Sequence, residues 1–81
     1  MNVRVNLFAQ MRRAAGAAAV DLELPSGATL GQALETFYEA HPRLGGFRSS
    51  VMTAVGLEYA AEDHVLTDGE EISLIPPVQG G

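Results

Sequence analysis

The residues best suited to carry chemistry stand at the end of the sequence, as the dipeptide Gly80-Gly81. Glycine has no Cβ atom, so this dipeptide can pass through a channel too narrow for other residues and adopt any backbone conformation there. Its terminal carboxylate is ionised at neutral pH and is therefore a poor electrophile. It must be activated, for example by adenylation, before sulfide or an amine can attack its carbon. A frayed glycine end without function is the alternative.

Side chains elsewhere offer few catalytic groups. His41 follows a predicted helix and His64 lies beside a predicted turn, and neither has the spacing of a metal ligand. Ser49 and Ser50 have no base nearby in the sequence, and the absence of cysteine excludes thiolates, disulfides and zinc–cysteine sites. We therefore expect no metal site, no cofactor held by this chain and no catalysis by this chain alone. ATP would be used by a partner enzyme that activates the carboxylate.

Length and charge narrow the possible partners. The 81 residues are 47% hydrophobic and 19% charged, which predicts one folded domain over residues 1–81. Five arginines and no lysine stand against ten acidic residues, for a net charge of −5. This balance argues against nucleic acid and a membrane surface as partners, and the lack of lysine excludes a phosphate-binding P-loop. The sequence shows no signal peptide or membrane span, so we expect a cytoplasmic location.

The spacing of apolar residues predicts the helices and strands that must position the tail. Apolar residues at helical spacing after a capping box of Thr29 and Gln32 predict a main helix over residues 30–40. A short helix over residues 9–15 would end at Gly16. Alternating apolar and polar residues predict strands, with a short edge strand among them, over residues 2–8, 18–24, 51–55, 58–60 and 71–75.

The remaining segments are connections. Residues 42–50 contain Gly45-Gly46 and are predicted to form a loop. The last strand is apolar on both faces, because Ile72 and Leu74 share one face and Ile75 lies on the other. Pro76 and Pro77 should end this strand, leaving residues 76–81 as a flexible tail. This order predicts an α+β fold of the β-grasp, or ubiquitin-like, type: a mixed four- to five-stranded sheet with one main amphipathic helix.

Two stretches resemble a known family. The opening Val5-Asn6-Leu7-Phe8-Ala9-Gln10-Met11-Arg12 and the ending, Leu66-Thr67-Asp68-Gly69 through Pro76-Pro77-Val78-Gln79-Gly80-Gly81, are similar to the MoaD/ThiS family of ubiquitin-like sulfur carriers. The similarity covers essentially the whole chain. The ending is the more specific of the two motifs.

The resemblance to the MoaD branch implies a role as the small subunit of molybdopterin synthase. An E1-like adenylyltransferase of the MoeB type would adenylate Gly81, and a sulfur donor system would convert it to a thiocarboxylate. The tail would then enter a large subunit of the MoaE type, within a heterotetramer, and donate sulfur to cyclic pyranopterin monophosphate. The product is molybdopterin, a step of molybdenum cofactor biosynthesis.

The resemblance also implies which residues meet the partners. Phe8, Tyr59 and Ile75 match an apolar patch on the sheet that packs on the large subunit, although a core role is the alternative for such side chains. With them, Pro76, Pro77 and Val78 are expected to bind the partner, and Gly80 and Gly81 to enter its active site.

Two questions stay open at this point. The chain has Gly56 where the family usually has asparagine, which keeps a turn but loses any side-chain hydrogen bond. The carrier could serve another pathway, such as thiamin synthesis, tRNA thiolation or cysteine synthesis. It could instead be a ubiquitin-like protein modifier that forms isopeptide bonds with lysines, or an interaction module with an inert tail.

Overall fold

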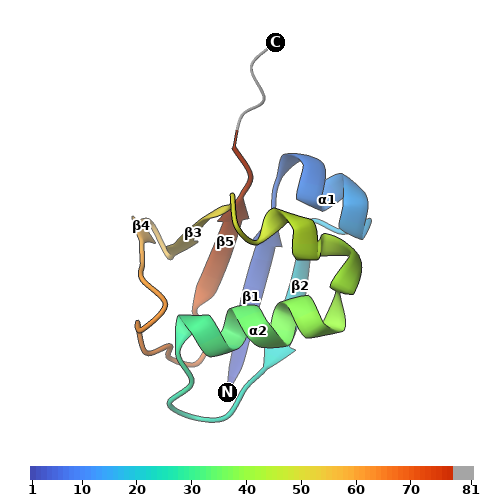
Figure 1. Ribbon diagram of the computed structural model, residues 1–81. Coiled ribbons are helices and arrows are strands. Elements are labelled where there is room, and N and C mark those ends of the chain that lie inside the picture. Colours follow the sequence, from blue (N-terminus) through green and yellow to red (C-terminus); the bar gives the residue numbers. More distant parts are fainter. Residues whose placement is uncertain (78–81) are drawn as a thin grey trace.

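The computed structural model describes residues 1–77 and contains one five-stranded sheet with helices (Figure 1). The strand order across the sheet is β2-β1-β5-β3-β4. This is the β-grasp layout that the element order predicted. In chain order the elements are β1 (Asn2–Leu7), α1 (Ala9–Ala15), β2 (Ala19–Glu23), α2 (Leu30–Ala40), the 3₁₀ helix η1 (Pro42–Phe47), β3 (Met52–Val55), β4 (Glu58–Tyr59) and β5 (Glu71–Ile75).

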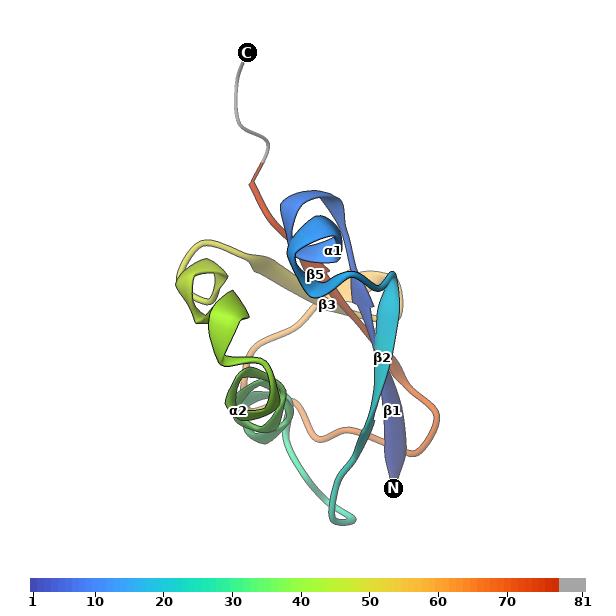
Figure 2. The ribbon, with the colours of Figure 1, turned by 90° about the vertical axis from the view of Figure 1, so that its right-hand side faces the viewer.

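The centre of the sheet contains the parallel pair of β1 and β5, which are the first and last strands in the sequence. Each has an antiparallel neighbour, β2 beside β1 and β3 beside β5. The turn between β3 and β4 contains Gly56 at φ 62°, so the turn role expected for this glycine is confirmed. Figure 2 shows α2 lying against one face of this sheet.

The main helix forms where its sequence predicts. The Thr29 hydroxyl accepts the Gln32 backbone N–H at 3.2 Å, and the Gln32 side chain accepts the Thr29 N–H at 2.8 Å, which completes the capping box. The apolar stripe of α2 is buried as its spacing requires. Together with the inward residues of β1 and β5 it forms the core, in which the most completely buried side chains include Leu7, Leu30, Phe37, Ile72 and Leu74.

The prediction of a loop over residues 42–50 is wrong for its first part. Pro42–Phe47 forms the 3₁₀ helix η1, which begins with a proline in its first turn. Leu44 is 2% exposed and belongs to the core. The glycine pair Gly45-Gly46 disfavours a helix by propensity, but burial of Leu44 against the rest of the core outweighs that preference.

The turn before β5 is fastened to the start of β1. Gly69, at φ 85°, donates its N–H to the Asn2 carbonyl oxygen at 2.7 Å, and the Asn2 N–H is accepted by Asp68 Oδ1 at 2.7 Å. Within the turn, Glu70 Oε1 accepts the Thr67 N–H at 2.7 Å. This hydrogen bond lowers the pKa of Glu70 below its ordinary 4.5, with a smaller contribution from His64, whose Nε2 lies 3.6 Å from Glu70 Oε1.

We predict that the Glu70 carboxylate makes stability depend on pH in acid. Because its folded-state pKa is lowered, its contribution is complete above about pH 4.5 and is lost as pH falls through the folded value. Glu70→Gln should therefore be less stable than wild type at neutral pH, and the difference should shrink as the pH falls. Urea unfolding between about pH 3 and pH 7 measures this. Glu39→Gln is the control, because it removes the same charge at an exposed position of α2. If stability depends on pH in the same way in both variants, the role assigned to Glu70 is contradicted.

Candidate functional site

The candidate site is the end of the molecule where β5 finishes. Leu7 of β1 is the register partner of Leu74, and Met52 of β3 is the partner of Ile75. The end of β1, the start of β3 and the end of β5 therefore lie side by side. Pro76 follows β5 as a buried residue and Pro77 as an exposed one. The predicted site residues Val78, Gly80 and Gly81 lie outside the described residues, as does most of the predicted tail.

The three apolar residues expected to meet a partner lie at the surface and not in the core. Phe8 is 44% exposed, Tyr59 is 67% exposed and Ile75 is half-buried. Ile75 lies on the face of β5 opposite to Ile72 and Leu74, as its position in the strand predicted. Within residues 1–77 no helix covers this outer face in Figure 2, so these side chains are available to a partner.

Two further residues of this face were missed by the sequence analysis. Met52 pairs with Ile75 and is 49% exposed, and Ala54 pairs with Tyr59 and lies outside the core cluster. The signal was available, because placing Val51, Thr53 and Val55 inward leaves their neighbours outward. We call Phe8, Met52, Ala54, Tyr59 and Ile75 the outer apolar face.

A strained residue joins this face to the first helix. Ala9 has φ 51°, in the left-handed region that costs an L-residue roughly 1–2 kcal/mol. The preceding Phe8 is extended, at φ −128° and ψ 155°, and its carbonyl oxygen accepts the Met11 N–H at 3.1 Å. The chain thus turns sharply at Ala9. This turn leaves Phe8 at the surface while α1 folds back over the end of the sheet.

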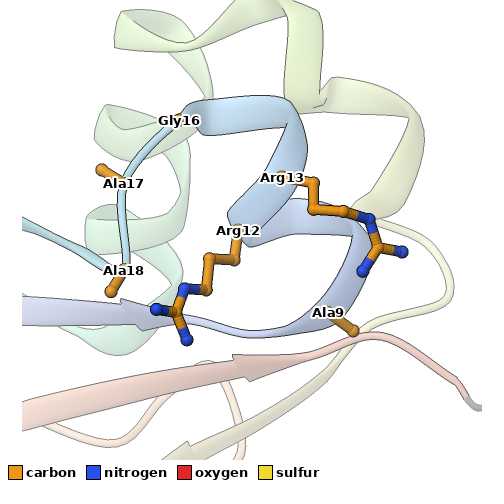
Figure 3. Close-up of a pocket in the computed structure, with 6 residues that line it drawn as sticks. All are labelled: Ala9, Arg12, Arg13, Gly16, Ala17 and Ala18. Carbon is orange, nitrogen blue, oxygen red and sulfur yellow. The ribbon is translucent and has the colours of Figure 1, made fainter.

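Beside this turn, α1 and the connection to β2 form a cleft of about 540 Å³. Figure 3 shows its lining, in which the two charged residues are arginines and the rest are alanines or glycine. The guanidinium groups of Arg12 and Arg13 extend to opposite sides of α1. The lining residues are Ala9, Arg12, Arg13, Gly16, Ala17 and Ala18.

Metal-ligating and membrane-spanning features are absent from the described part of the chain. Within residues 1–77 no three His, Asp or Glu side chains converge to hold a metal ion. No helix over the same residues is long and apolar enough to cross a membrane.

Comparison with known proteins identifies the family. The model of the ThiS family matches residues 5–81, which is nearly the whole chain. The chain belongs to the ThiS family. The resemblance noted in its first and last residues is thereby confirmed, and the ThiS match includes the terminal diglycine.

Individual relatives fall into two groups by name. The molybdopterin synthase sulfur carrier subunit of Arabidopsis thaliana is 32% identical over 81 residues, covering 100% of this chain and 84% of that protein. Small archaeal modifier protein 1 of Haloferax volcanii is also 32% identical, covering 93% of this chain and 95% of its own length. A crystal structure of that archaeal protein superimposes with a TM-score of 0.91 at 30% identity, and each chain is covered completely.

A third comparison concerns an assembly. The complex of subunits 1 and 2 of molybdopterin-converting factor from Helicobacter pylori 26695 includes a chain that matches with a TM-score of 0.75 at 23% identity. The match covers 100% of both chains. At this identity the comparison establishes the shared fold alone.

We predict that the strain at Ala9 comes from its left-handed backbone conformation and not from contacts with neighbouring residues. Ala9→Val should lower the free energy of unfolding by about 1–2 kcal/mol, because a β-branched residue is disfavoured in the left-handed region. Ala9→Gly should be neutral or stabilising, since glycine adopts this conformation freely. Chemical denaturation measures both changes. Ala14→Val, at an exposed position of α1 without positive φ, is the control, and a loss at Ala14 equal to that at Ala9 would contradict the prediction.

Proposed function

We propose that this member of the ThiS family is a sulfur carrier and the small subunit of molybdopterin synthase. The observation that carries the proposal is the family match that includes the diglycine, together with the full-length similarity to a molybdopterin synthase sulfur carrier subunit. The outer apolar face supports it, because it lies at the end of β5, where the chain continues toward Gly81. A partner seated on this face would be placed to receive the tail.

The chemistry of the tail would take three steps. A carboxylate oxygen of Gly81 attacks the α-phosphorus of ATP on an E1-like enzyme of the MoeB type, and pyrophosphate leaves. Sulfide delivered by a donor system then attacks the acyl carbon and AMP leaves, so that a thiocarboxylate results. On the large subunit, of the MoaE type, the thiocarboxylate sulfur would bond to a carbon of cyclic pyranopterin monophosphate as an oxygen substituent leaves that carbon. Water would then cleave the acyl carbon–sulfur bond and restore the carboxylate.

The first experiment is mass spectrometry of the tail. The chain is incubated with an E1-like enzyme, ATP and a sulfur donor, then treated with a thiol-alkylating reagent. Because the sequence has no cysteine, an alkylated C-terminal fragment should identify a thiocarboxylate on Gly81. Alkylation also separates this product from methionine oxidation, which gives nearly the same mass gain. Deletion of Gly81 is the control, and an unmodified tail beside a modified reference carrier would contradict the proposal.

The outer apolar face makes a second prediction. Ile75→Asp should weaken binding to the large subunit by about 30-fold or more, because a buried charge replaces a central apolar contact. Isothermal titration of the two subunits measures this. Val65→Asp is the matched control, because Val65 is 57% exposed and lies beside α2, where it forms a bridge with Thr29. An equal loss of affinity in both variants would show that the outer apolar face is not part of the interface.

The second candidate function is protein modification. It is favoured by the archaeal modifier protein, which is as similar in sequence as the molybdopterin synthase relative from Arabidopsis. Activation would start identically, but a lysine amine of a target protein would then attack the acyl carbon, and AMP would leave as the isopeptide bond forms. Digested lysates searched for lysines that carry the tail residues distinguish the two functions. Such adducts would support the modifier, and a free carrier with thiocarboxylate would support the sulfur donor.

A further inference from the structure

The charges of this chain are separated along its sequence. Residues 8–18 and 40–57 contain four of the five arginines and no aspartate or glutamate. The rest of the chain contains Arg4 and all ten acidic residues. The two segments therefore carry a charge of +4 and the remainder −9, which together make the net −5. We call the four arginines Arg12, Arg13, Arg43 and Arg48 the basic collar.

The fold brings the two basic segments to one end. The first includes α1, which follows β1, and the second includes η1, which precedes β3. Because β1 ends and β3 begins beside the end of β5, both helices lie at that end, where they contact each other. Figure 1 shows α1 and the yellow-green segment of η1 near the arrowhead of β5. The collar therefore lies on or beside two elements at the end from which the chain continues toward Gly81.

The collar side chains are free to meet a partner. All four arginines are exposed, and none of them forms a salt bridge within residues 1–77. Arg48 lies with its guanidinium carbon 5.5 Å from the centre of the Tyr38 ring, which positions it while leaving its charge unpaired. A second cleft beside that of Arg12 and Arg13 is lined by Arg43 and His41 and likewise contains no carboxylate.

We propose that the basic collar is a docking surface for an acidic protein surface, which it steers and orients toward the end of β5. The occupant is assigned by charge complementarity and by continuity with the outer apolar face, since Phe8 and Ala9 join the two. A chain of net charge −5 would otherwise repel an acidic partner, so a positive end decides which way round the two proteins meet. This inference rests on the proposed function, because the partner is the large subunit, to which the adjoining outer apolar face is assigned.

A protein surface fits the collar better than a small anion does. Arg12 and Arg13 line one cleft, but their guanidinium groups extend to opposite sides of α1 instead of converging on one point. Arg43 and Arg48 lie on or just after η1. A purely local role exists for two of the four, because Arg12 and Arg13 stand in the last turn of α1, where positive charge favours the helix dipole.

The test is the association rate with the large subunit of the same organism, measured by stopped flow at several salt concentrations. We expect the wild-type rate to fall about tenfold between low and high salt. The double variant Arg12→Glu and Arg13→Glu should associate about tenfold more slowly at low salt and lose most of this salt dependence. The corresponding lysine variants should keep both properties, because steering needs charge and not guanidinium geometry.

Matched controls separate steering from net charge and from folding. Arg4→Glu changes the net charge by the same amount as a single Arg→Glu change in the collar, but Arg4 lies in β1, where its side chain pairs with Asp21 at 3.3 Å. The single variants Arg13→Glu and Arg43→Glu should each slow association with the partner, whereas Arg4→Glu should have little effect on the rate. Equal slowing by Arg4→Glu and Arg13→Glu would overturn the collar. Thermal unfolding of every variant shows whether a merely structural role in α1 explains the loss.

Two further outcomes are distinguished in the same samples. If inorganic phosphate or ATP binds at Arg12 and Arg13 below about 1 mM in physiological salt, seen as shifts of their NMR signals, the cleft is a small-anion site and the proposal is overturned. Mass spectrometry of the tail reports the proposed function independently. If the wild type becomes thiocarboxylated but its association rate does not depend on the collar charges, the docking proposal alone is refuted. If the tail stays unmodified, the proposed function is refuted.

Discussion

The parallel pairing of β1 with β5 is the constraint on which the rest of the structure depends. Because the two strands run in the same direction, the first strand of the chain ends beside the last one. Whatever follows β1 and whatever follows β5 must therefore share one end of the molecule. Helix α1 and the end of β5 are neighbours for this reason. The antiparallel strand β3 adds η1 to the same end, since that helix enters β3 beside Ile75.

The central position of β5 gives it two faces with different tasks. Its inner face supplies Ile72 and Leu74, both completely buried beneath α2. Its outer face supplies Ile75, half-buried among other apolar side chains that no helix within residues 1–77 covers. Exposed apolar surface of this kind is uncommon on a small monomeric domain and is typical of an interface. A single strand thus holds the core together and presents the surface that we assign to a partner.

In the proposed function, the chemistry of this protein is separated from its stability. The reactive group would be the carboxylate of Gly81, which lies outside the described residues, and a partner enzyme would activate it. The task left to the folded body would then be recognition. An apolar face, a strained turn at Ala9 and arginines that form no salt bridge within residues 1–77 lie toward one end. The two segments that carry these arginines, residues 8–18 and 40–57, contain no acidic residue. Apolar contact supplies affinity and charge supplies orientation.

Much of this molecule could be predicted from its sequence, because the decisive signals are local. Period-two alternation predicted β1 and β2, and the pair of Thr29 and Gln32 predicted the start of α2. The element order and the family resemblance predicted the fold, and the resemblance predicted the surface position of Phe8, Tyr59 and Ile75. What only the tertiary structure decided depends on contacts between distant segments. Burial of Leu44 favours the 3₁₀ helix Pro42–Phe47 in a glycine-containing segment that the sequence predicted to be a loop. Strand register places Met52 beside Ile75, and the parallel centre of the sheet brings arginines 30 or more positions apart in the sequence toward one end. No local pattern contains that information, because register and strand direction arise only when the core closes.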